Sequence, residues 1–375
     1  MQTSIGMEIS YLRSSPLFNL SLGSKELFHS NFLAWLFELY PRELGGALSR
    51  FLKDRSGDVA ITNVLRELKN RDLTIHFGNG QELVIENKVK SLPYIEQLTL
   101  YSTDAQPHQN FVLLSLVPPP FSKDGRIDAG SATWTAITYA DLASLLEGVR
   151  DDITDQYHAS ILADYIGFIR SMSAIFSSNA VKEDELFSEI LSPYRNDTLS
   201  ELHQIRIGDV YQKLRCEALA GILYKELGSE YPGRVHISAP VANRVADDIY
   251  VAHGMTNSIG LIEASCVIAP GLFLTIQVQG LSYRQMVQGY AGYGKDAKGV
   301  AERLRGQKLW FDFSNVGTGL KEYPRGEKPF NGYAGIDFYR SVTIPDDMTA
   351  KDVVRAIVAD VRRIVTHRSE MSAAA

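Results

Sequence analysis

The sequence predicts an α/β fold in two domains, with a mixed sheet flanked by helices followed by an α+β domain. Three observations lead to this prediction. The chain has 375 residues, a length that suggests two domains. Its first half alternates helical and strand-like patterns, whereas its second half holds a long helical pattern followed by several alternating apolar runs. A polar stretch over 177–200 separates the halves, so we expect domains over 1–180 and 200–375.

The first expected helix covers residues 24–40. Ser24 is a suitable N-cap, an apolar stripe repeats with helical spacing, and Pro41 ends the pattern. A second helix is expected over 43–54. The other elements expected in this half are strands over 63–77 and 82–90, a helix over 92–104, a strand over 111–117, and helices over 139–149 and 153–177.

The second half is expected to hold an antiparallel sheet between helices. Its elements are expected to be a helix over 201–228, strands over 234–241, 247–252, 259–268 and 271–279, helices over 283–290 and 296–305, strands over 308–313 and 335–343, and a final helix over 348–367.

Composition and charge are those of an ordinary globular protein. Hydrophobic residues make up 45% and charged residues 22% of the chain. The net charge of −6 argues against a surface that is basic throughout, although a local basic groove remains compatible with it. The two cysteines, Cys216 and Cys266, offer neither zinc-site spacing nor a disulfide framework, so we expect a reducing, cytoplasmic environment. We expect no signal peptide and no transmembrane helix.

The stretch from Asp72 to Lys88 carries the strongest functional signal. Two strand-like runs flank a Gly-Asn-Gly turn, and successive strand side chains point to opposite faces, so Glu86 and Lys88 share a face. A three-residue loop over 78–80 pairs Phe77 with Gln81. Counting outward from that pair places Asp72 opposite Glu86, with Cβ atoms roughly 5 Å apart.

This register brings two carboxylates and an ammonium onto one small patch. Two carboxylates so close repel each other unless a cation lies between them. Hard oxygen ligands suit Mg²⁺. The patch therefore indicates a metal site with an adjacent lysine, which is the arrangement needed to cut a phosphodiester. The competing interpretation is a solvated cross-strand ion pair, which would stabilise the fold little; the apolar neighbours of Glu86 and Lys88 argue against it.

Four motifs in order resemble the PD-(D/E)XK nuclease superfamily. They are Glu26 followed by Ser30, Asp72, then Glu86 and Lys88 in Ile-Glu-Asn-Lys, and Gln97 and Tyr101 in Gln-Leu-Thr-Leu-Tyr. The resemblance covers roughly residues 20–175 and implies a restriction-endonuclease-like three-layer core. The family's proline is missing before Asp72, where Arg71 stands; we expect Arg71 to be structural and to point away from the face of Asp72.

The resemblance also implies roles. Glu26, Asp72 and Glu86 would hold Mg²⁺, for which Mn²⁺ is expected to substitute, with the main-chain carbonyl of Asn87 as a further ligand. Lys88 would position or deprotonate the attacking water. Gln97 and Tyr101, one turn apart on a helix face, would hold the lysine, a water or a phosphate. For Glu26 the alternative is an acid favoured by a helix N-terminus. For Tyr101 it is packing, and for His29 and Ser30 it is helix packing or capping.

Two further segments have competing interpretations. Residues 289–296 nearly spell a phosphate-binding P-loop, but Asp296 stands where Ser or Thr must reach Mg²⁺, and no buried strand is expected to precede it. Residues 283–310 interleave bases with aromatic residues, which suits nucleic-acid contact, or equally an exposed charged face above core aromatics. The members of this set are Tyr283, Arg284, Tyr290, Tyr293, Lys295, Lys298, Arg303, Arg305, Lys308 and Trp310.

The leading hypothesis is a Mg²⁺-dependent endonuclease that acts on DNA. The alternatives are an RNase, or a nucleic-acid-binding or scaffold protein of the same fold without turnover. The C-terminal domain is expected to recognise nucleic acid or a partner protein. A homodimer would supply the two active sites that a double-strand cut commonly needs. The family resemblance suggests a role in antiviral defence.

Overall fold

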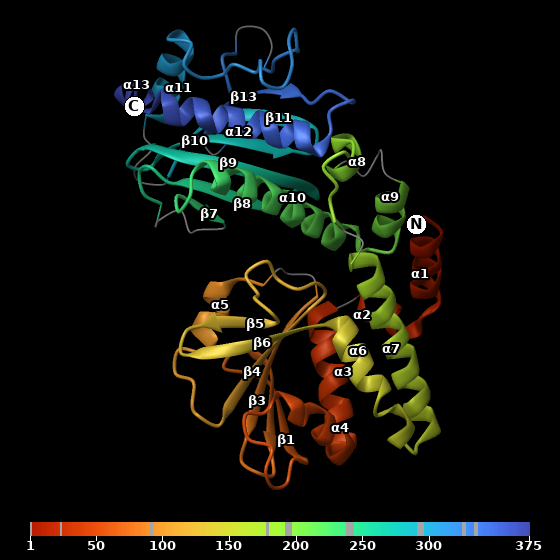
Figure 1. The fold of residues 1–375 in the computed structure, drawn as a ribbon. Coiled ribbons are helices and arrows are strands. Elements are labelled where there is room, and N and C mark those ends of the chain that lie inside the picture. The colour runs from red at the N-terminus through yellow and green to blue at the C-terminus, as the bar shows by residue number, and fades with distance from the viewer. Residues whose placement is uncertain are drawn as a thin grey trace. The chain divides into compact units, whose positions relative to one another are not determined.

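The computed structural model places two compact units in the chain, Met1–Ser178 and Asn179–Ala375, called here the N-terminal and C-terminal units (Figure 1). The side chains of residues 2–4, 25 and 26 are not described. The residues described are 2–22, 25–89, 93–177, 180–191, 197–237, 244–290, 296–324, 328–333 and 337–375.

The N-terminal unit begins with four helices. Pro16 and Pro41 each stand at a first helical position, where a missing N–H breaks no hydrogen bond. Ser15 caps the second helix, because its Oγ accepts the N–H of Phe18 at 3.1 Å. The helices are α1 (Gln2–Ser14), α2 (Pro16–Ser21), α3 (Lys25–Leu39) and α4 (Pro41–Leu48), followed by a 3-10 turn, Ser49–Phe51.

A mixed six-stranded sheet follows, in the order β1-β2-β3-β4-β6-β5. The first three strands are antiparallel, β3, β4 and β6 are parallel, and β5 runs antiparallel to β6. The strands are β1 (Ile61–Leu68), β2 (Arg71–Phe77), β3 (Glu82–Lys88), β4 (Gln109–Ser115), β5 (Arg126–Ala129) and β6 (Ala132–Thr138).

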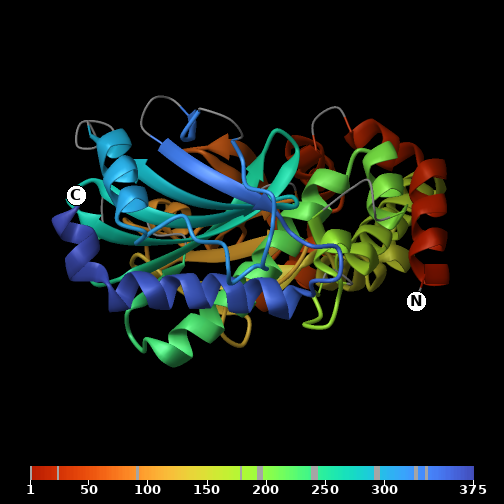
Figure 2. The same cartoon turned by 90° about the horizontal axis from the view of Figure 1, so that it is seen from above.

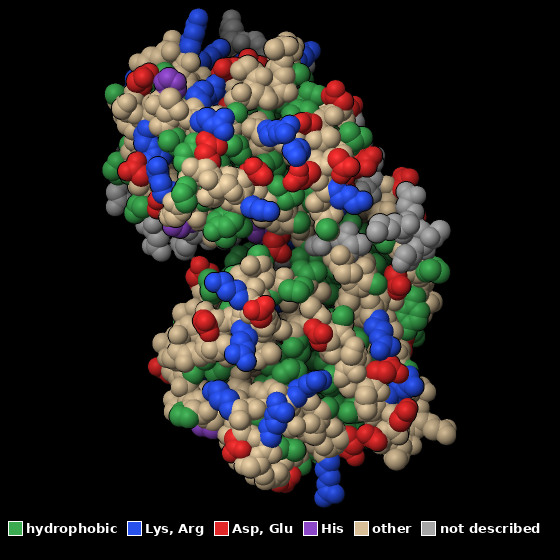
Figure 3. Space-filling view, in the orientation of Figure 1, with side chains coloured by type: hydrophobic (Ala, Val, Ile, Leu, Met, Phe, Trp, Pro, Cys, Tyr) green, Lys and Arg blue, Asp and Glu red, His purple; other side chains and the backbone are tan. Residues whose placement is uncertain are grey.

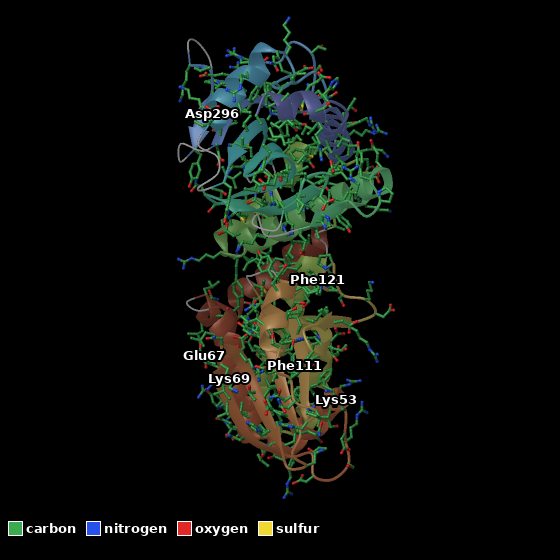
Figure 4. All side chains as sticks on the ribbon, turned by 90° about the vertical axis from the view of Figure 1, so that its left-hand side faces the viewer. Lys53, Glu67, Lys69, Phe111, Phe121 and Asp296 are labelled. Carbon is green, nitrogen blue, oxygen red and sulfur yellow. The ribbon has the colours of Figure 1, made fainter. Side chains whose placement is uncertain are left out.

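Helices cover both faces of this sheet (Figure 1). On one face lie α3, α6 (Tyr139–Glu147) and α7 (Gln156–Ser177). On the other lies α5 (Ile95–Tyr101), whose Leu98 packs with Val84 and Phe111. Figure 4 shows Phe111 among the strands of the unit. The predicted three-layer core, a mixed sheet flanked by helices, is confirmed.

The strand expected over 63–77 is in fact two strands. The chain turns at Lys69 and Asn70, and β1 pairs antiparallel with β2. Lys69 and Asn70 have φ of +54° and +63°, a left-handed conformation that asparagine tolerates but lysine rarely adopts. Because no glycine marks the turn, the sequence pattern does not reveal it. Glu67 and Lys69 are exposed, as Figure 4 shows at the edge of the unit. Helices α1 and α2 and strands β5 and β6 were also not predicted.

The C-terminal unit contains one seven-stranded sheet, in the order β12-β13-β11-β10-β9-β8-β7, antiparallel except where β7 pairs with β8. Its elements are α8 (Phe187–Leu191), α9 (Asp197–Gln204), α10 (Gly208–Glu230), β7 (Val235–Ile237), β8 (Ile249–Thr256), β9 (Ile259–Ala269), β10 (Leu272–Gln279), β11 (Ser282–Gly289), α11 (Ala297–Gly306), β12 (Asn331–Tyr333), β13 (Asp337–Thr343), α12 (Ala350–Thr366) and α13 (Arg368–Ala373).

Helices α10 and α12 lie on the same face of this sheet (Figure 2). The core lies between them and the strands. Cys216 of α10 and Cys266 of β9 are both buried there as free thiols, and burial raises the pKa of each to about 12. Helix α12 begins with a capping box, in which Thr349 and Asp352 each accept the other's main-chain N–H.

A buried carboxylate ties α12 to the sheet. Asp360 is fully buried, and its Oδ2 accepts hydrogen bonds from the Tyr283 hydroxyl at 2.8 Å and from Gln285 at 2.7 Å. Its Oδ1 accepts from Asn315 at 2.8 Å and from Arg363 at 2.9 Å. Burial raises the pKa of Asp360, an effect that the charge of Arg363 opposes. The four donors explain how a carboxylate is accommodated in this core.

Three expectations for this half were wrong. The helix expected over 201–228 is broken between α9 and α10, where Arg206 has φ of +60°. Residues 283–290, expected to be helical, form strand β11, in which Tyr283, Gln285 and Val287 alternate onto the face of α12 with the period of a strand. Residues 308–313, expected to be a strand, form turns and irregular backbone. Helix α11, strand β13 and helix α12 lie near their predicted positions.

Helix α7 is long and apolar enough to cross a membrane by length and composition, with a mean hydropathy of 1.3. It packs against α1, α2 and α6, however. Of the 18-residue apolar stretch within this helix, 56% is buried inside the protein, as in the core helix of a globular unit. On the face seen in Figure 3, basic and acidic side chains are interspersed over each unit, and they form no continuous basic field there.

Candidate metal-dependent nuclease site

The β2–β3 turn has the three-residue form that the sequence predicted. The N–H of Phe77 donates to the carbonyl of Gln81 at 3.0 Å, and the N–H of Gly80 donates to the carbonyl of Phe77 at 3.0 Å. Gly80 has φ of +79°, a left-handed conformation that glycine adopts without strain.

The turn sets the register of the two strands. Pairs run from His76 opposite Glu82 to Leu73 opposite Ile85. The observed pairs end there, and continuing the same register by one step sets Asp72 opposite Glu86. The register predicted from local sequence is therefore confirmed, and it places both carboxylates on one face at the end of the hairpin.

Asp72 closes the hairpin at that end. Residues 77 and 81 form a hydrogen-bonded pair. In an antiparallel ladder every second pair is hydrogen-bonded, so a regular ladder would direct the N–H of Asn87 at the main-chain carbonyl of Arg71. Instead, Asp72 Oδ2 accepts the N–H of Asn87 at 2.7 Å. The carboxylate thereby fixes the main chain that immediately follows Glu86.

Glu86 and Lys88 form a buried ion pair. Glu86 is 2% and Lys88 9% exposed, and Lys88 Nζ lies 2.7 Å from Glu86 Oε1. The ammonium offsets the cost of burying the carboxylate. This pair is not the solvated surface pair of the competing interpretation.

Helix α5 brings Gln97 to Glu86 and places Tyr101 beside Gln97. The Gln97 side-chain amide donates to Glu86 Oε1 at 3.2 Å and to the Tyr101 hydroxyl at 2.7 Å. Arg71 donates to the main-chain carbonyl of Tyr101 at 2.7 Å and lies over the ring of Phe111, which holds the end of α5 on the sheet. Arg71 is structural in these contacts, but they lie on the α5 side, so the expectation that it points away from the face of Asp72 was wrong.

Asn87 points to the opposite face of β3. Its side-chain amide donates to Ser30 Oγ of α3 at 3.3 Å, and its Oδ1 accepts the hydroxyl of Tyr139 at the start of α6. Beside this pair, His29 Nδ1 lies 2.9 Å from the Tyr165 hydroxyl in a buried aromatic cluster. Ser30 and His29 thus pack behind the strand that carries Glu86, as the packing alternative expected.

Glu26 lies in the first turn of α3, four residues before Ser30. Its side chain lies outside the described residues, so its predicted role as a metal ligand stays a prediction.

The donor set fits a small divalent cation. Asp72 and Glu86 supply hard oxygen ligands on facing strands, and Mg²⁺ in proteins uses one or two carboxylates and keeps waters in its other positions. Among the described side chains, no group of three or more His, Cys, Asp or Glu gathers at one point. The further protein ligands predicted from the sequence are the main-chain carbonyl of Asn87 and Glu26.

Sequence reasoning missed Tyr139 and the contact of Arg71 with α5. The Tyr139–Asn87 hydrogen bond joins residues 52 positions apart, and the Arg71–Tyr101 bond joins residues 30 apart. The sequence around Tyr139 and Arg71 contains no local pattern that predicts these distant partners. Only the Thr138–Asp141 capping box, which fixes where α6 begins, is visible in the sequence beside Tyr139.

The basic and aromatic segment of the second half does not form one surface. Tyr283 and Trp310 are core residues, 0% and 2% exposed. Arg303 pairs with Asp296 at 2.8 Å. These placements favour the alternative of core aromatics beneath a charged face. Tyr293 and Lys295 lie outside the described residues.

The near P-loop follows a strand, contrary to expectation. Strand β11 ends at Gly289, and α11 begins at Ala297. Residues 291–295 lie outside the described residues. Asp296, at the N-cap of α11, holds Arg303 with a carboxylate where a P-loop needs a hydroxyl.

A family model described as the PD-(D/E)XK nuclease superfamily matches residues 17–167. The matched segment contains every predicted site residue, and the resemblance to the superfamily that the four motifs indicated is confirmed over these residues. Members of the superfamily generally use divalent metals such as Mg²⁺. No curated protein and no solved structure matches the chain.

Proposed function

We propose that the N-terminal unit is a Mg²⁺-dependent endonuclease that hydrolyses phosphodiester bonds in DNA. One arrangement carries the proposal: the hairpin register sets Asp72 opposite Glu86, Asp72 holds the main-chain N–H of Asn87, and the buried ammonium of Lys88 lies 2.7 Å from Glu86. This arrangement lies within the segment that matches a nuclease superfamily.

Each residue has a role in this proposal. Asp72 and Glu86 would hold the cation, with the Asn87 carbonyl and Glu26 as the further ligands. The chemistry that a cation would supply there is polarisation of the scissile phosphate and activation of a water. Lys88 holds a proton at Nζ and donates toward the phosphate or the water, as a compact point charge that arginine does not replace.

Helix α5 orients these groups. Gln97 donates to the same oxygen of Glu86 that Lys88 contacts, so it fixes the rotamer of that carboxylate. Tyr101 accepts from Gln97 and so holds its amide in place. We assign both as positioning residues, because their described contacts reach Glu86 and each other.

Two alternatives stay open to test. An RNase would use the same site, since nothing in the described contacts selects the sugar. A binding or scaffold protein without turnover is the non-enzymatic alternative. The complete set of Asp72, Glu86 and Lys88 favours turnover, because loss of a carboxylate or of the lysine is what disables such a site.

The test is cleavage of labelled double-stranded DNA, single-stranded DNA and RNA, with Mg²⁺ or with EDTA. Wild type is compared with Glu86→Gln and with Glu82→Gln. Glu82 is the matched control, because it lies on the same strand and face as Glu86 but next to the turn, where it accepts a hydrogen bond from Gln109 at 2.9 Å and lies 3.9 Å from Arg71.

We expect Mg²⁺-dependent cleavage of DNA that Glu86→Gln abolishes and Glu82→Gln retains. Cleavage of RNA alone would support the RNase. Equal cleavage by Glu86→Gln and wild type would overturn the site. A folded protein that binds these nucleic acids and cuts none of them would support the non-enzymatic alternative.

A further inference from the structure

The C-terminal unit contains a cavity of about 750 Å³, a size typical of small-molecule sites. It lies where α8 and α9 meet the ends of two β-hairpins, and Figure 1 shows both helices at one end of the sheet. The hairpin turns are two residues long, at Asn257–Ser258 and at Gly280–Leu281. Nothing in the nuclease assignment uses this cavity.

The cavity is lined by a partly buried arginine. Arg284 of β11 donates from Nε to Ser282 Oγ at 3.3 Å and from Nη1 to Gln277 Oε1 at 2.8 Å. Its guanidinium lies over the ring of Tyr339, 5.0 Å from the centroid. The guanidinium is therefore held in one orientation before any ligand arrives.

The charge of Arg284 has no direct counterion among the described residues. Both of its hydrogen-bond acceptors are neutral, and burial lowers the pKa of the guanidinium. Gln277, which accepts from Arg284, donates in turn to Glu263 at 3.2 Å. The Glu263 carboxylate is therefore linked to the arginine only through this glutamine. A desolvated cation without a counterion favours an anionic ligand, because its charge is screened less than in water.

The rest of the lining suits an organic phosphate. Hydroxyl and amide side chains line the same cavity as the arginine and can complete the hydrogen bonds of phosphate oxygens. Apolar side chains offer a surface for the body of the molecule. The hydroxyl and amide groups are those of Ser200, Ser258, Ser282, Thr343, Asn257 and Gln279, and the apolar ones those of Leu191, Ile259 and Leu281.

We propose that this cavity binds a small organic phosphate of about mononucleotide size, with the phosphate on the Arg284 guanidinium. A planar guanidinium presents paired donors that match phosphate oxygens. The C-terminal unit is then a ligand-binding unit joined to the nuclease, and the proposal holds whether or not the nuclease is active.

The test is calorimetric titration of the full chain carrying Asp72→Ala, in EDTA, so that binding at the nuclease site is not counted. The probes are 5′-AMP, adenosine and inorganic phosphate. Arg284→Gln removes the cation. Arg305→Gln is the matched control, because Arg305 also lies over an aromatic ring, that of Phe330, outside the cavity.

We expect one equivalent of AMP to bind, and adenosine and inorganic phosphate to bind at least about tenfold more weakly. Arg284→Gln should weaken AMP at least about tenfold and leave adenosine unchanged, with Arg305→Gln like the parent. If Arg284→Gln fails to fold, Thr343→Trp replaces it, since Thr343 is exposed at the end of β13 and a large side chain there occupies the cavity. No AMP binding, equal binding of AMP to Arg284→Gln, or inorganic phosphate as tight as AMP would each overturn the proposal.

Discussion

Asp72 Oδ2 accepts the main-chain N–H of Asn87 at 2.7 Å, where the β2–β3 ladder ends. One carboxylate oxygen thus fixes the backbone between Glu86 and Lys88. The candidate site therefore rests on two paired strands and not on a loop, which holds its groups in a defined geometry.

Asp72→Asn should separate the charge of this residue from its structural bond. Asparagine keeps an oxygen that accepts the Asn87 N–H, so the free energy of unfolding of Asp72→Asn should be close to that of wild type. The free energy of unfolding of Asp72→Ala should be lower by about 1–3 kcal/mol. Both variants should lose Mg²⁺-dependent cleavage. Urea unfolding and the cleavage assay measure the two effects. Cleavage by Asp72→Asn at the wild-type rate would contradict a ligand role.

Lys88→Met should lower both activity and stability. The variant removes the Lys88 ammonium that lies 2.7 Å from the buried Glu86 carboxylate. We therefore expect the free energy of unfolding in EDTA to fall by roughly 3–5 kcal/mol. Mg²⁺ should restore part of that loss, because a cation on Glu86 replaces the missing charge. Cleavage should fall about 10²–10⁴-fold. Thermal unfolding with EDTA and with Mg²⁺ checks the linkage; an equal loss in both conditions would argue against a metal at Glu86.

Gln97→Ala should weaken the response to Mg²⁺ more than Tyr101→Phe does. Gln97 contacts Glu86 directly, and loss of such a supporting partner typically costs 10–100-fold in metal affinity or activity. Tyr101→Phe removes only the hydroxyl that Gln97 contacts, so we expect a smaller effect. The measurement is cleavage rate against Mg²⁺ concentration. The positioning role would be contradicted if Gln97→Ala cleaved more slowly than wild type even at saturating Mg²⁺ while its half-saturating Mg²⁺ concentration was unchanged.

Tyr139→Phe should destabilise the N-terminal unit by about 1–3 kcal/mol. The variant removes the hydroxyl that Asn87 Oδ1 accepts and leaves a buried amide oxygen without that donor. Denaturant unfolding measures the loss. Tyr157→Phe is the control, because Tyr157 is 72% exposed and should not change stability.

Glu217→Gln should change how stability depends on pH. Burial raises the pKa of Glu217 in α10 to about 7, from an ordinary 4.5. The folded state therefore binds this proton more tightly than the unfolded state. Its contribution is complete below about pH 4.5 and is lost as pH rises through 7.

Between pH 5 and pH 8, the free energy of unfolding of wild type should fall by roughly 1–3 kcal/mol relative to that of Glu217→Gln. Urea midpoints of both proteins at the two pH values measure this difference. Glu226→Gln, an exposed glutamate on the same helix, is the control and should follow wild type. A constant difference between wild type and Glu217→Gln across this range would contradict the raised pKa.

Local sequence predicted the hairpin part of the site because the chemistry there is local. The turn at Gly78–Gly80 fixes the register, and strand alternation then places Asp72, Glu86 and Lys88 on one face. The helical spacing of Gln97 and Tyr101 was likewise readable. The β1–β2 turn was not, since Lys69 enters a left-handed conformation without a glycine to mark it.

The sequence by itself determined the four motifs that resemble the superfamily. It also determined the register of the β2–β3 hairpin and the set of polar side chains on its face, because a period of two residues is a property of neighbouring positions. Only the tertiary structure decided that Gln97 contacts Glu86, that Asn87 is held between Ser30 and Tyr139, and that Arg284 lines a cavity. These contacts join segments brought together by packing of the whole unit, and burial and hydrogen-bond partners exist only once that packing has formed.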